Sequence, residues 1–326
     1  MRRWLPLLCL ALLLTACAQA TAGAADPTAT PAPGDSSSSP VPAATRTAPS
    51  TSTPTPFPAL PTTPTLTPTP PFTRTPTRVP SPTPCAEPHG SVLTDTVPSA
   101  YLRYNIDLQV YLPPCYAVQP AERYPVLYLI HGLNFTEDQW VRLGTAETAD
   151  ALIDAGEIAP LIIIMPRDRR DVRLDPAFVT DLLPYIEANY RTRTDREYRA
   201  IGGLSRGGGW SIHLGLRYPE LFGRVGGHSP AVFLGDENNL LAYTRAIARD
   251  GPVPALYLDV GDTDAQRQSA IWLDQIFTWF EFGHTYLLQP GGHTEAYWSA
   301  HLADYLRFYA ADWRDQPAPR PSPVTH

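Results

Sequence analysis

Lysine is absent from this 326-residue chain, and all 25 of its basic residues are arginine. Schiff-base catalysis needs a lysine amine, and so does a Walker-type phosphate loop. The sequence therefore excludes both kinds of site. Acidic side chains outnumber basic ones by 32 to 25, which leaves a net charge of −7. This acidic balance argues against a nucleic-acid-binding protein.

The N-terminus lacks a hydrophobic run long enough to cross a membrane. The apolar stretch at residues 4–14 follows two arginines and has the length of a secretion-signal core. It ends in the letters LTAC, at residues 14–17, which resemble a bacterial lipobox. The resemblance implies that residues 1–17 are a lipoprotein signal peptide and that Cys17 is the lipidated mature N-terminus. The alternative is an ordinary cleavable signal with an incidental cysteine.

Cysteine is scarce, and no cluster of cysteines has the spacing of a metal site, so we expect no metal. Of the four cysteines, Cys9 leaves with the signal and Cys17 carries the lipid in this interpretation. Thiols outside the cytoplasm tend to be oxidised, so we predict a disulfide between the remaining Cys85 and Cys115. The alternative is two separate buried thiols.

Proline, by contrast, is abundant in the N-terminal third. Eighteen of the 38 prolines lie within residues 27–84, among many threonines and serines. Such a segment buries too little apolar surface to offset its ordering entropy, so we expect residues 18–84 to be a disordered tether. At about 3 Å per residue it would extend on the order of 100–200 Å.

The part that follows the tether has the composition and pattern of one globular domain. We assign it to residues 85–315, followed by a disordered tail at 316–326; its length of about 230 residues suffices for one well-buried core. Strand and helix patterns alternate, which predicts an α/β fold with a mostly parallel sheet and helices on both faces. We expect strands at 105–112, 126–130, 161–165, 197–201, 224–227, 255–260 and 285–288, and helices at 141–155, 175–188, 210–218, 271–282 and 296–309.

The most informative motif is Gly203-x-Ser205-x-Gly207, which lies between a predicted strand and a predicted helix. This spacing and context are typical of a nucleophile elbow, a tight turn that exposes a serine hydroxyl. Glycine is needed two residues to either side because a side chain there would collide with the neighbouring strand or helix. A serine hydroxyl also needs a base to take its proton.

Candidates for that base and for its orienting acid follow in the chain order Ser, Asp, His. Asp262 and Asp264 come directly after the strand predicted at 255–260, and His293 follows the strand predicted at 285–288. In a parallel sheet these positions meet at the carboxyl ends of the strands. Either aspartate satisfies the order, whereas Asp259 lies within the strand.

Several motifs together resemble the putative esterase family of the α/β-hydrolase superfamily, which includes esterase D, feruloyl esterases and the antigen 85 mycolyltransferases. They are VYLPP at 110–114, YPVLYLIHG at 124–132, AIGGLS with two following glycines at 200–208, and GGH at 291–293 with Trp298. The resemblance covers about residues 90–310 and implies an α/β-hydrolase fold and a serine esterase that needs no cofactor.

The resemblance also implies residue roles. Ser205 is the nucleophile, His293 the base and Asp264 the acid, with Asp262 as the rival. The amides of Leu133 and Arg206 are the expected oxyanion donors. Arg206 replaces the methionine that is frequent in the family, so its charge is expected to reach the pocket and to favour an acidic substrate group.

Other residues near the predicted strand ends have weaker implications. We expect His131 to shape the oxyanion loop. His228 follows a strand and is a candidate to border the cleft, although a structural role is the favoured interpretation. Trp140 and Trp298 are candidates for stacking against substrate, with core packing as an equal alternative. The charged run at residues 167–171 borders the site and either binds an anionic substrate or forms a solvated, ion-paired loop.

The sequence therefore predicts a secreted, lipid-anchored serine esterase that acts on small-molecule or polysaccharide esters at the outer face of the cell membrane. An acyltransferase that uses the same acyl-enzyme and a non-catalytic binding lipoprotein are the alternatives. The acyl group and the alcohol are not encoded in any motif.

Overall fold

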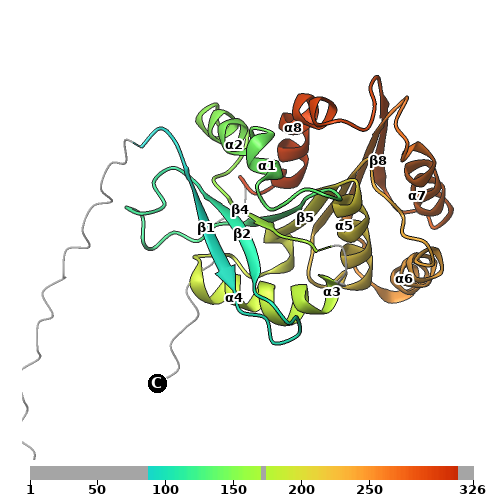
Figure 1. Ribbon diagram of the computed structural model, residues 1–326, viewed down its shortest axis with the longest axis horizontal. Coiled ribbons are helices and arrows are strands. Elements are labelled where there is room, and N and C mark those ends of the chain that lie inside the picture. The colour runs from blue at the N-terminus through green and yellow to red at the C-terminus, as the bar shows by residue number, and fades with distance from the viewer. Residues whose placement is uncertain (1–86, 170–173, 315–326) are drawn as a thin grey trace, which may run out of the picture. The chain divides into compact units, whose positions relative to one another are not determined.

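A computed structural model describes residues 87–169 and 174–314, which form the domain drawn in colour in Figure 1. The predicted signal peptide, Cys17, the tether and Cys85 lie outside the described residues. Cys115 is disulfide-bonded. Within the described part of the chain, no helix combines the length and the apolar character that a membrane span requires.

An eight-stranded sheet organises the domain, with the order β1-β2-β4-β3-β5-β6-β7-β8. Strands β1 and β2 pair with each other antiparallel, β2 also pairs antiparallel with β4, and all other pairs are parallel. The strands are β1 (Ser91–Val97), β2 (Ile106–Leu112), β3 (Val126–Ile130), β4 (Ile162–Pro166), β5 (Arg199–Leu204), β6 (Arg224–His228), β7 (Ala255–Gly261) and β8 (His284–Gln289).

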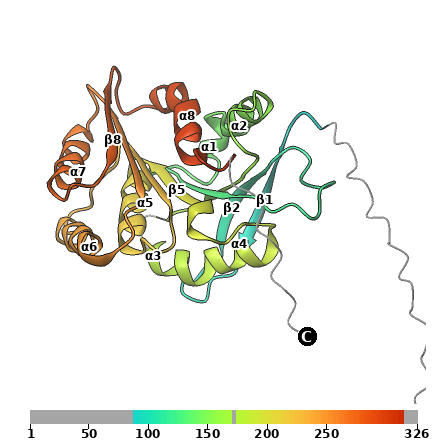
Figure 2. The same ribbon diagram turned by 180° about the vertical axis from the view of Figure 1, so that it is seen from behind.

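Helices cover both faces of this sheet, as Figures 1 and 2 show from opposite sides. They are α1 (Gln139–Arg142), α2 (Thr145–Asp154), α3 (Leu174–Ala177), a π-helical turn (Phe178–Leu182), α4 (Leu183–Asn189), a 3-10 turn (Arg196–Tyr198), α5 (Arg206–Arg217), α6 (Glu237–Asp250), α7 (Arg267–Trp279) and α8 (Glu295–Ala310).

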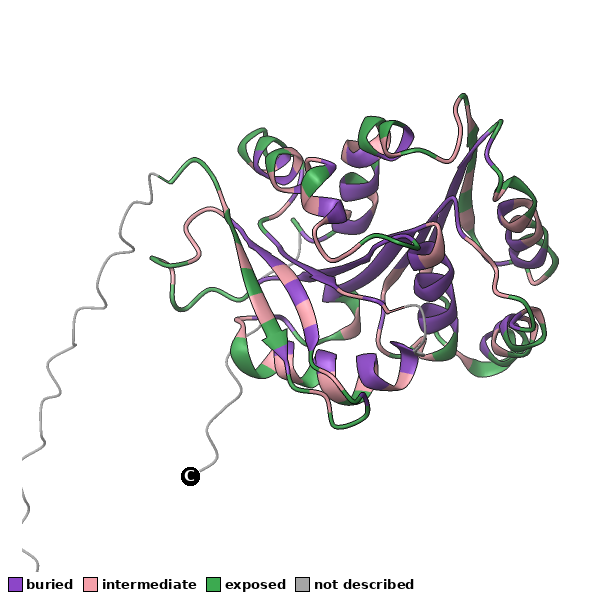
Figure 3. Cartoon of the chain, in the orientation of Figure 1, coloured by how far each residue is buried: buried purple, intermediate pink, exposed green. Residues whose placement is uncertain are grey.

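Each face of the sheet has its own hydrophobic core because side chains alternate along a strand. Leu127 and Leu129 of β3 pack with residues of α1, α2 and α8. Val126, Tyr128 and Ile130 pack with residues of α3 to α7. The central strands are buried throughout, as Figure 3 shows, which explains their continuous apolar sequences. The predicted fold class is confirmed.

Two predicted helices are divided in the structure. The helix predicted at 141–155 is two helices, because Gly144 adopts a left-handed conformation with φ of 92° between α1 and α2. The helix predicted at 175–188 is interrupted by the π-helical turn just before Pro184, which has no N–H to donate. Strand β1 and helix α6 were not predicted from the sequence.

Candidate active site

Ser205 lies at the sharp turn between β5 and α5. Its backbone has φ of 54° and ψ of −119°, a conformation that is costly for a residue with a side chain. Three hydrogen bonds hold this turn: the Ser205 amide donates to the His228 carbonyl at 2.8 Å, and its carbonyl accepts from Gly209 and Ala231 at 3.0 Å each. The neighbouring strand β6 and the loop after it thus support the strained residue.

The two flanking glycines are required by close contacts. A Cβ atom on Gly203 would lie 2.4 Å from the backbone of Gly207, and one on Gly207 would lie 2.1 Å from the carbonyl oxygen of Ile130. The obstructing atoms are backbone atoms, so no side-chain rotation relieves the contact. These contacts are the physical reason for the Gly-x-Ser-x-Gly spacing.

Three side chains from separate loops meet at this turn. His293 Nε2 lies 2.8 Å from Ser205 Oγ, and His293 Nδ1 lies 2.9 and 3.0 Å from the two carboxylate oxygens of Asp264. A carboxylate only accepts, so Nδ1 carries the proton and Nε2 is free to accept from the serine hydroxyl. This arrangement is able to move a proton from the hydroxyl to the imidazole while the carboxylate holds the ring.

The carboxylate that contacts the imidazole belongs to Asp264. Burial alone would raise the pKa of Asp264, but hydrogen bonds from His293, the Gln266 amide and Ser229 outweigh it and hold the pKa below its usual value. Asp262 is exposed and accepts from the Gly291 amide at 3.0 Å. Asp259 is fully buried and accepts from His228 at 2.6 Å.

The loop after β3 carries the predicted oxyanion donor Leu133. This loop lies beside the serine, since a Cβ on Gly132 would be 3.6 Å from Ser205 Cβ. His131 Nδ1 lies 2.8 Å from the Gly132 carbonyl, and His131 Nε2 accepts from the Asp168 amide at 2.9 Å. Burial lowers the pKa of His131, which favours this neutral tautomer. The other predicted donor, the Arg206 amide, is at the first position of α5, where a backbone N–H has no acceptor within the helix.

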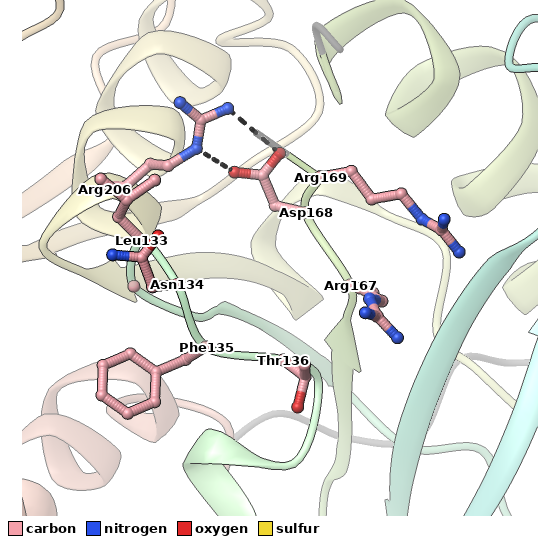
Figure 4. Close-up of a pocket in the computed structure, with 9 residues that line it drawn as sticks. Leu133, Asn134, Phe135, Thr136, Arg167, Asp168, Arg169 and Arg206 are labelled. Carbon is pink, nitrogen blue, oxygen red and sulfur yellow. Dashed lines mark hydrogen bonds and ion pairs between the residues drawn. The ribbon is translucent and has the colours of Figure 1, made fainter. Parts of the chain in front are cut away.

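A cavity of about 340 Å³ opens beside the oxyanion loop (Figure 4). Its lining consists of the loop and two strand-end segments: Gly132, Leu133, Asn134, Phe135, Thr136, Arg167, Asp168, Arg169 and Arg206. Leu133 and Phe135 are exposed and supply apolar surface, while the three arginines supply hydrogen-bond donors. The predicted charged run therefore borders the cavity through residues 167–169, and Arg170 and Asp171 lie outside the described residues.

The side chain of Arg206 reaches the cavity, but an adjacent carboxylate compensates its charge. Arg206 Nε lies 2.6 Å from Asp168 Oδ2, as Figure 4 shows, and the side chain of Asp168 is 1% exposed. Burial raises the pKa of Asp168, although Arg206 opposes this shift. Arg206 therefore reaches the pocket as expected, and Asp168 offsets the charge that was expected to favour an acidic substrate group.

Burial also separates the alternatives that the sequence left open for three other residues. Trp140 is fully buried and donates to the Ile130 carbonyl at 3.1 Å, so it packs in the core instead of stacking on substrate. Trp298 is 3% exposed, and its ring packs edge-to-face against the His293 ring, with 4.9 Å between the ring centroids. Trp298 therefore packs against the imidazole instead of stacking on substrate. His228 does not border the cleft, because it is buried against Asp259 and Tyr309.

Residues 99–309, more than half of the chain, match the family described as Putative esterase. The chain belongs to this putative esterase family. A solved ferulic acid esterase has a TM-score of 0.62 and 29% identity to it, over 68% of this chain and 98% of that one. The feruloyl esterase module of Clostridium thermocellum shares the fold, with a TM-score of 0.62 and 20% identity over 73% of this chain and 94% of the module. The predicted class of serine carboxylic-ester hydrolase is confirmed for the family domain.

Longer relatives match only through this domain. The chain is 32% identical over 165 residues to the endo-1,4-beta-xylanase/feruloyl esterase of Xylanibacter ruminicola, which is 46% of this chain and 23% of that protein. It is 30% identical over 143 residues to an esterase of Mycobacterium tuberculosis, or 39% of this chain and 29% of that protein. The chain thus spans about a quarter of the length of these curated relatives.

Proposed function

We propose that this protein hydrolyses carboxylic esters through an acyl-enzyme formed on Ser205. The observation that carries the proposal is the continuous path from Ser205 Oγ to His293 Nε2 at 2.8 Å and from His293 Nδ1 to Asp264 at 2.9 Å. The family membership supports the same reaction class.

In the first half of the reaction, Ser205 Oγ attacks the ester carbonyl while His293 Nε2 takes its proton. Asp264 stabilises the imidazolium that forms and keeps the ring oriented. The amides of Leu133 and Arg206 donate to the oxyanion of the tetrahedral intermediate, each contributing about 3 kcal/mol of barrier reduction. The intermediate collapses when Nε2 returns the proton to the leaving alcohol oxygen.

The second half repeats these steps with water. His293 removes a proton from water as the water oxygen attacks the acyl carbon, and the same two amides hold the second oxyanion. Collapse breaks the bond to Ser205 Oγ, which recovers its proton from Nε2. The carboxylic acid leaves and the enzyme is regenerated.

We propose acylated carbohydrates as the substrate class. The relatives named as feruloyl or ferulic acid esterases support this choice, as does the mixed lining of the cavity, where Leu133 and Phe135 face a group of arginine donors. A panel of acetyl, feruloyl and longer acyl esters would identify the preferred acyl group. A flat response across the panel would contradict an acyl-specific pocket.

We also propose that the enzyme is held at the outer face of the cell membrane through a lipid on Cys17, with residues 18–84 as a tether. The signal-like N-terminus and the LTAC letters at residues 14–17 support this location. Metabolic labelling with a tagged fatty acid should mark the wild-type protein, and Cys17→Ala should abolish the label. A label that persists in this variant would refute the anchor.

The deciding experiment for the activity is Ser205→Ala. We expect this variant to lose hydrolysis of a short activated ester and labelling by a fluorophosphonate probe, while its circular dichroism and melting temperature stay near wild type. Unchanged turnover would refute the mechanism. The products formed with a sugar acceptor present would distinguish hydrolysis from acyl transfer.

A further inference from the structure

A buried glutamine joins two loops of the active site that are far apart in the sequence. Gln139, at the start of α1, is 0% exposed. Its Oε1 accepts from the Gly132 amide at 2.8 Å, and its Nε2 donates to Glu295 Oε1 at 3.0 Å. Gly132 belongs to the oxyanion loop, and Glu295 begins α8, two residues after His293.

The partners of Gln139 determine the orientation of its amide. A backbone N–H only donates and a carboxylate only accepts, so the oxygen must face Gly132 and the nitrogen must face Glu295. A glutamate or a methionine at this position would lose at least one of the two hydrogen bonds. Position 139 therefore requires an uncharged side chain as long as glutamine that carries both a hydrogen-bond donor and an acceptor.

The contact with Gly132 bears directly on the predicted oxyanion donor. The Gly132 carbonyl accepts from His131 Nδ1 at 2.8 Å and from the Phe135 amide at 3.3 Å. Because the peptide unit is planar and trans, fixing this carbonyl points the Leu133 N–H in the opposite direction. Gln139 holds the preceding N–H, so both backbone polar groups of Gly132 are held.

Arg142, an arginine at the protein surface, holds Glu295 in place. Arg142, at the end of α1, places Nη1 3.1 and 3.2 Å from the two carboxylate oxygens of Glu295. Both side chains are more than a third exposed, so this ion pair adds little stability by itself. Helices α1 and α8 lie next to each other in both ribbon views (Figures 1 and 2). Gln139 and Arg142 of α1 both contact Glu295 of α8.

We propose that Gln139 is a positioning residue that aims the Leu133 amide at the oxyanion and fixes the oxyanion loop relative to the histidine loop. It acts without touching substrate, through Gly132 on one side and Glu295 on the other. The inference rests on the proposed function, since it assigns Gln139 a part in stabilising the same intermediate.

The test uses Gln139→Met, which keeps the length of the side chain and removes both hydrogen bonds. We expect kcat for an activated ester to fall about 10- to 100-fold, since misdirecting one oxyanion donor has an effect of this order, while KM stays nearly constant. Gln275→Met is the matched control, because Gln275 is exposed on α7, outside the loops that carry Ser205, Asp264 and His293. Melting temperatures establish that both variants are folded.

A thionoester substrate distinguishes a loss of oxyanion stabilisation from a general loss of activity. Sulfur accepts hydrogen bonds poorly, so an aligned oxyanion hole makes the wild-type enzyme favour the oxygen ester over the thionoester. We expect the ester-to-thionoester ratio of kcat/KM to fall in Gln139→Met and to stay at the wild-type value in Gln275→Met. An unchanged ratio in Gln139→Met would overturn the proposal, even if its overall rate were lower.

A pair of charge variants covers the case in which Gln139→Met does not fold. Gln139→Glu keeps the acceptor for Gly132 but places a carboxylate against Glu295, and Glu295→Gln added to it restores a donor across that contact. We expect the kcat of the double variant to be at least about tenfold higher than that of Gln139→Glu alone. A double variant with the same kcat as Gln139→Glu would overturn the proposed coupling between Gln139 and Glu295. Persistent turnover in Ser205→Ala, by contrast, would overturn the proposed function itself.

Discussion

At the scale of single residues, Asp262 and Asp264 lie on one short loop, yet only Asp264 contacts the imidazole of His293. We expect Asp264→Asn to lower kcat by about 10³- to 10⁴-fold, because an amide facing Nδ1 favours the wrong tautomer of the ring. Steady-state kinetics on an activated ester would measure the loss.

Asp262→Asn is the matched control for this variant. Its side chain retains an oxygen that accepts from the Gly291 amide, so its effect on kcat should be far smaller. If the two variants lost activity equally, the assignment of Asp264 as the acid would be wrong.

Arg206 offers a second test at this scale. We expect Arg206→Met, which introduces the residue frequent in the family, to lower the free energy of unfolding by about 3–5 kcal/mol, because it leaves the buried Asp168 without its partner. Urea denaturation would measure the change. Adding Asp168→Asn should recover much of the loss, and a double variant as unstable as the single one would refute the pairing.

The sequence predicted the three side chains that meet at the β5–α5 turn better than it predicted the residues that support them. Ser205, Asp264 and His293 each follow a recognisable strand and belong to motifs with fixed spacing. Gln139 belongs to no motif, because its role depends on Glu295, 156 positions away. The role of Trp140 stayed open for a related reason: a tryptophan serves equally well in a core or on a binding surface, and only burial separates the two roles.

At the scale of secondary-structure elements, the strand–turn–helix unit around Ser205 depends on backbone contacts that exclude a Cβ. We expect Gly203→Ala to destabilise the domain by about 2–4 kcal/mol and to abolish esterase activity, because β5 and α5 must separate to admit the methyl group. Thermal unfolding and activity would be measured together.

Gly283→Ala is the control for this substitution, since no atom lies within 4 Å of the added Cβ. Its melting temperature should remain near that of the wild type. A Gly203→Ala variant as stable and active as this control would contradict the packing explanation.

Strands buried on both faces were predicted well, whereas two elements at the periphery, β1 and α6, were missed. The strand β3 was predicted at its observed bounds because it reads as a continuous apolar run. The edge strand β1 has mostly exposed polar residues and resembles a loop in sequence. Helix α6 buries Leu240, Thr244 and Ile247 at the spacing of one helix face, so its periodicity was present in the sequence and was overlooked.

At the scale of the whole molecule, a buried histidine ties three helices together. His213 of α5 lies 2.8 Å from Asp236, which precedes α6, and 3.6 Å from Asp175 of α3. Burial alone would lower the pKa of His213, but the two carboxylates outweigh it and raise the pKa above its usual value. Arg217 also pairs with Asp175, so the cluster contains two cationic and two anionic groups at low pH.

This raised pKa predicts a pH-dependent contribution to stability. A proton bound more tightly in the folded state stabilises the fold fully below the unfolded-state pKa of about 6.5, and the contribution is lost as pH rises through the higher folded-state pKa. The unfolding free energy of the wild type minus that of His213→Gln should therefore decrease from pH 6 upward. Urea denaturation at a series of pH values would measure it, and a flat difference would refute the prediction.

The position of the general base in the chain also has a consequence for biosynthesis. Ser205, the proposed nucleophile, leaves the ribosome 88 residues before His293, its proposed base. That base follows the last strand of the sheet, at its outer edge. A nascent or truncated chain that ends before residue 293 therefore contains the serine but has nothing to activate it. Under the proposed mechanism, competence to cleave esters therefore arises only after residue 293 has been synthesised and β8 has joined the sheet.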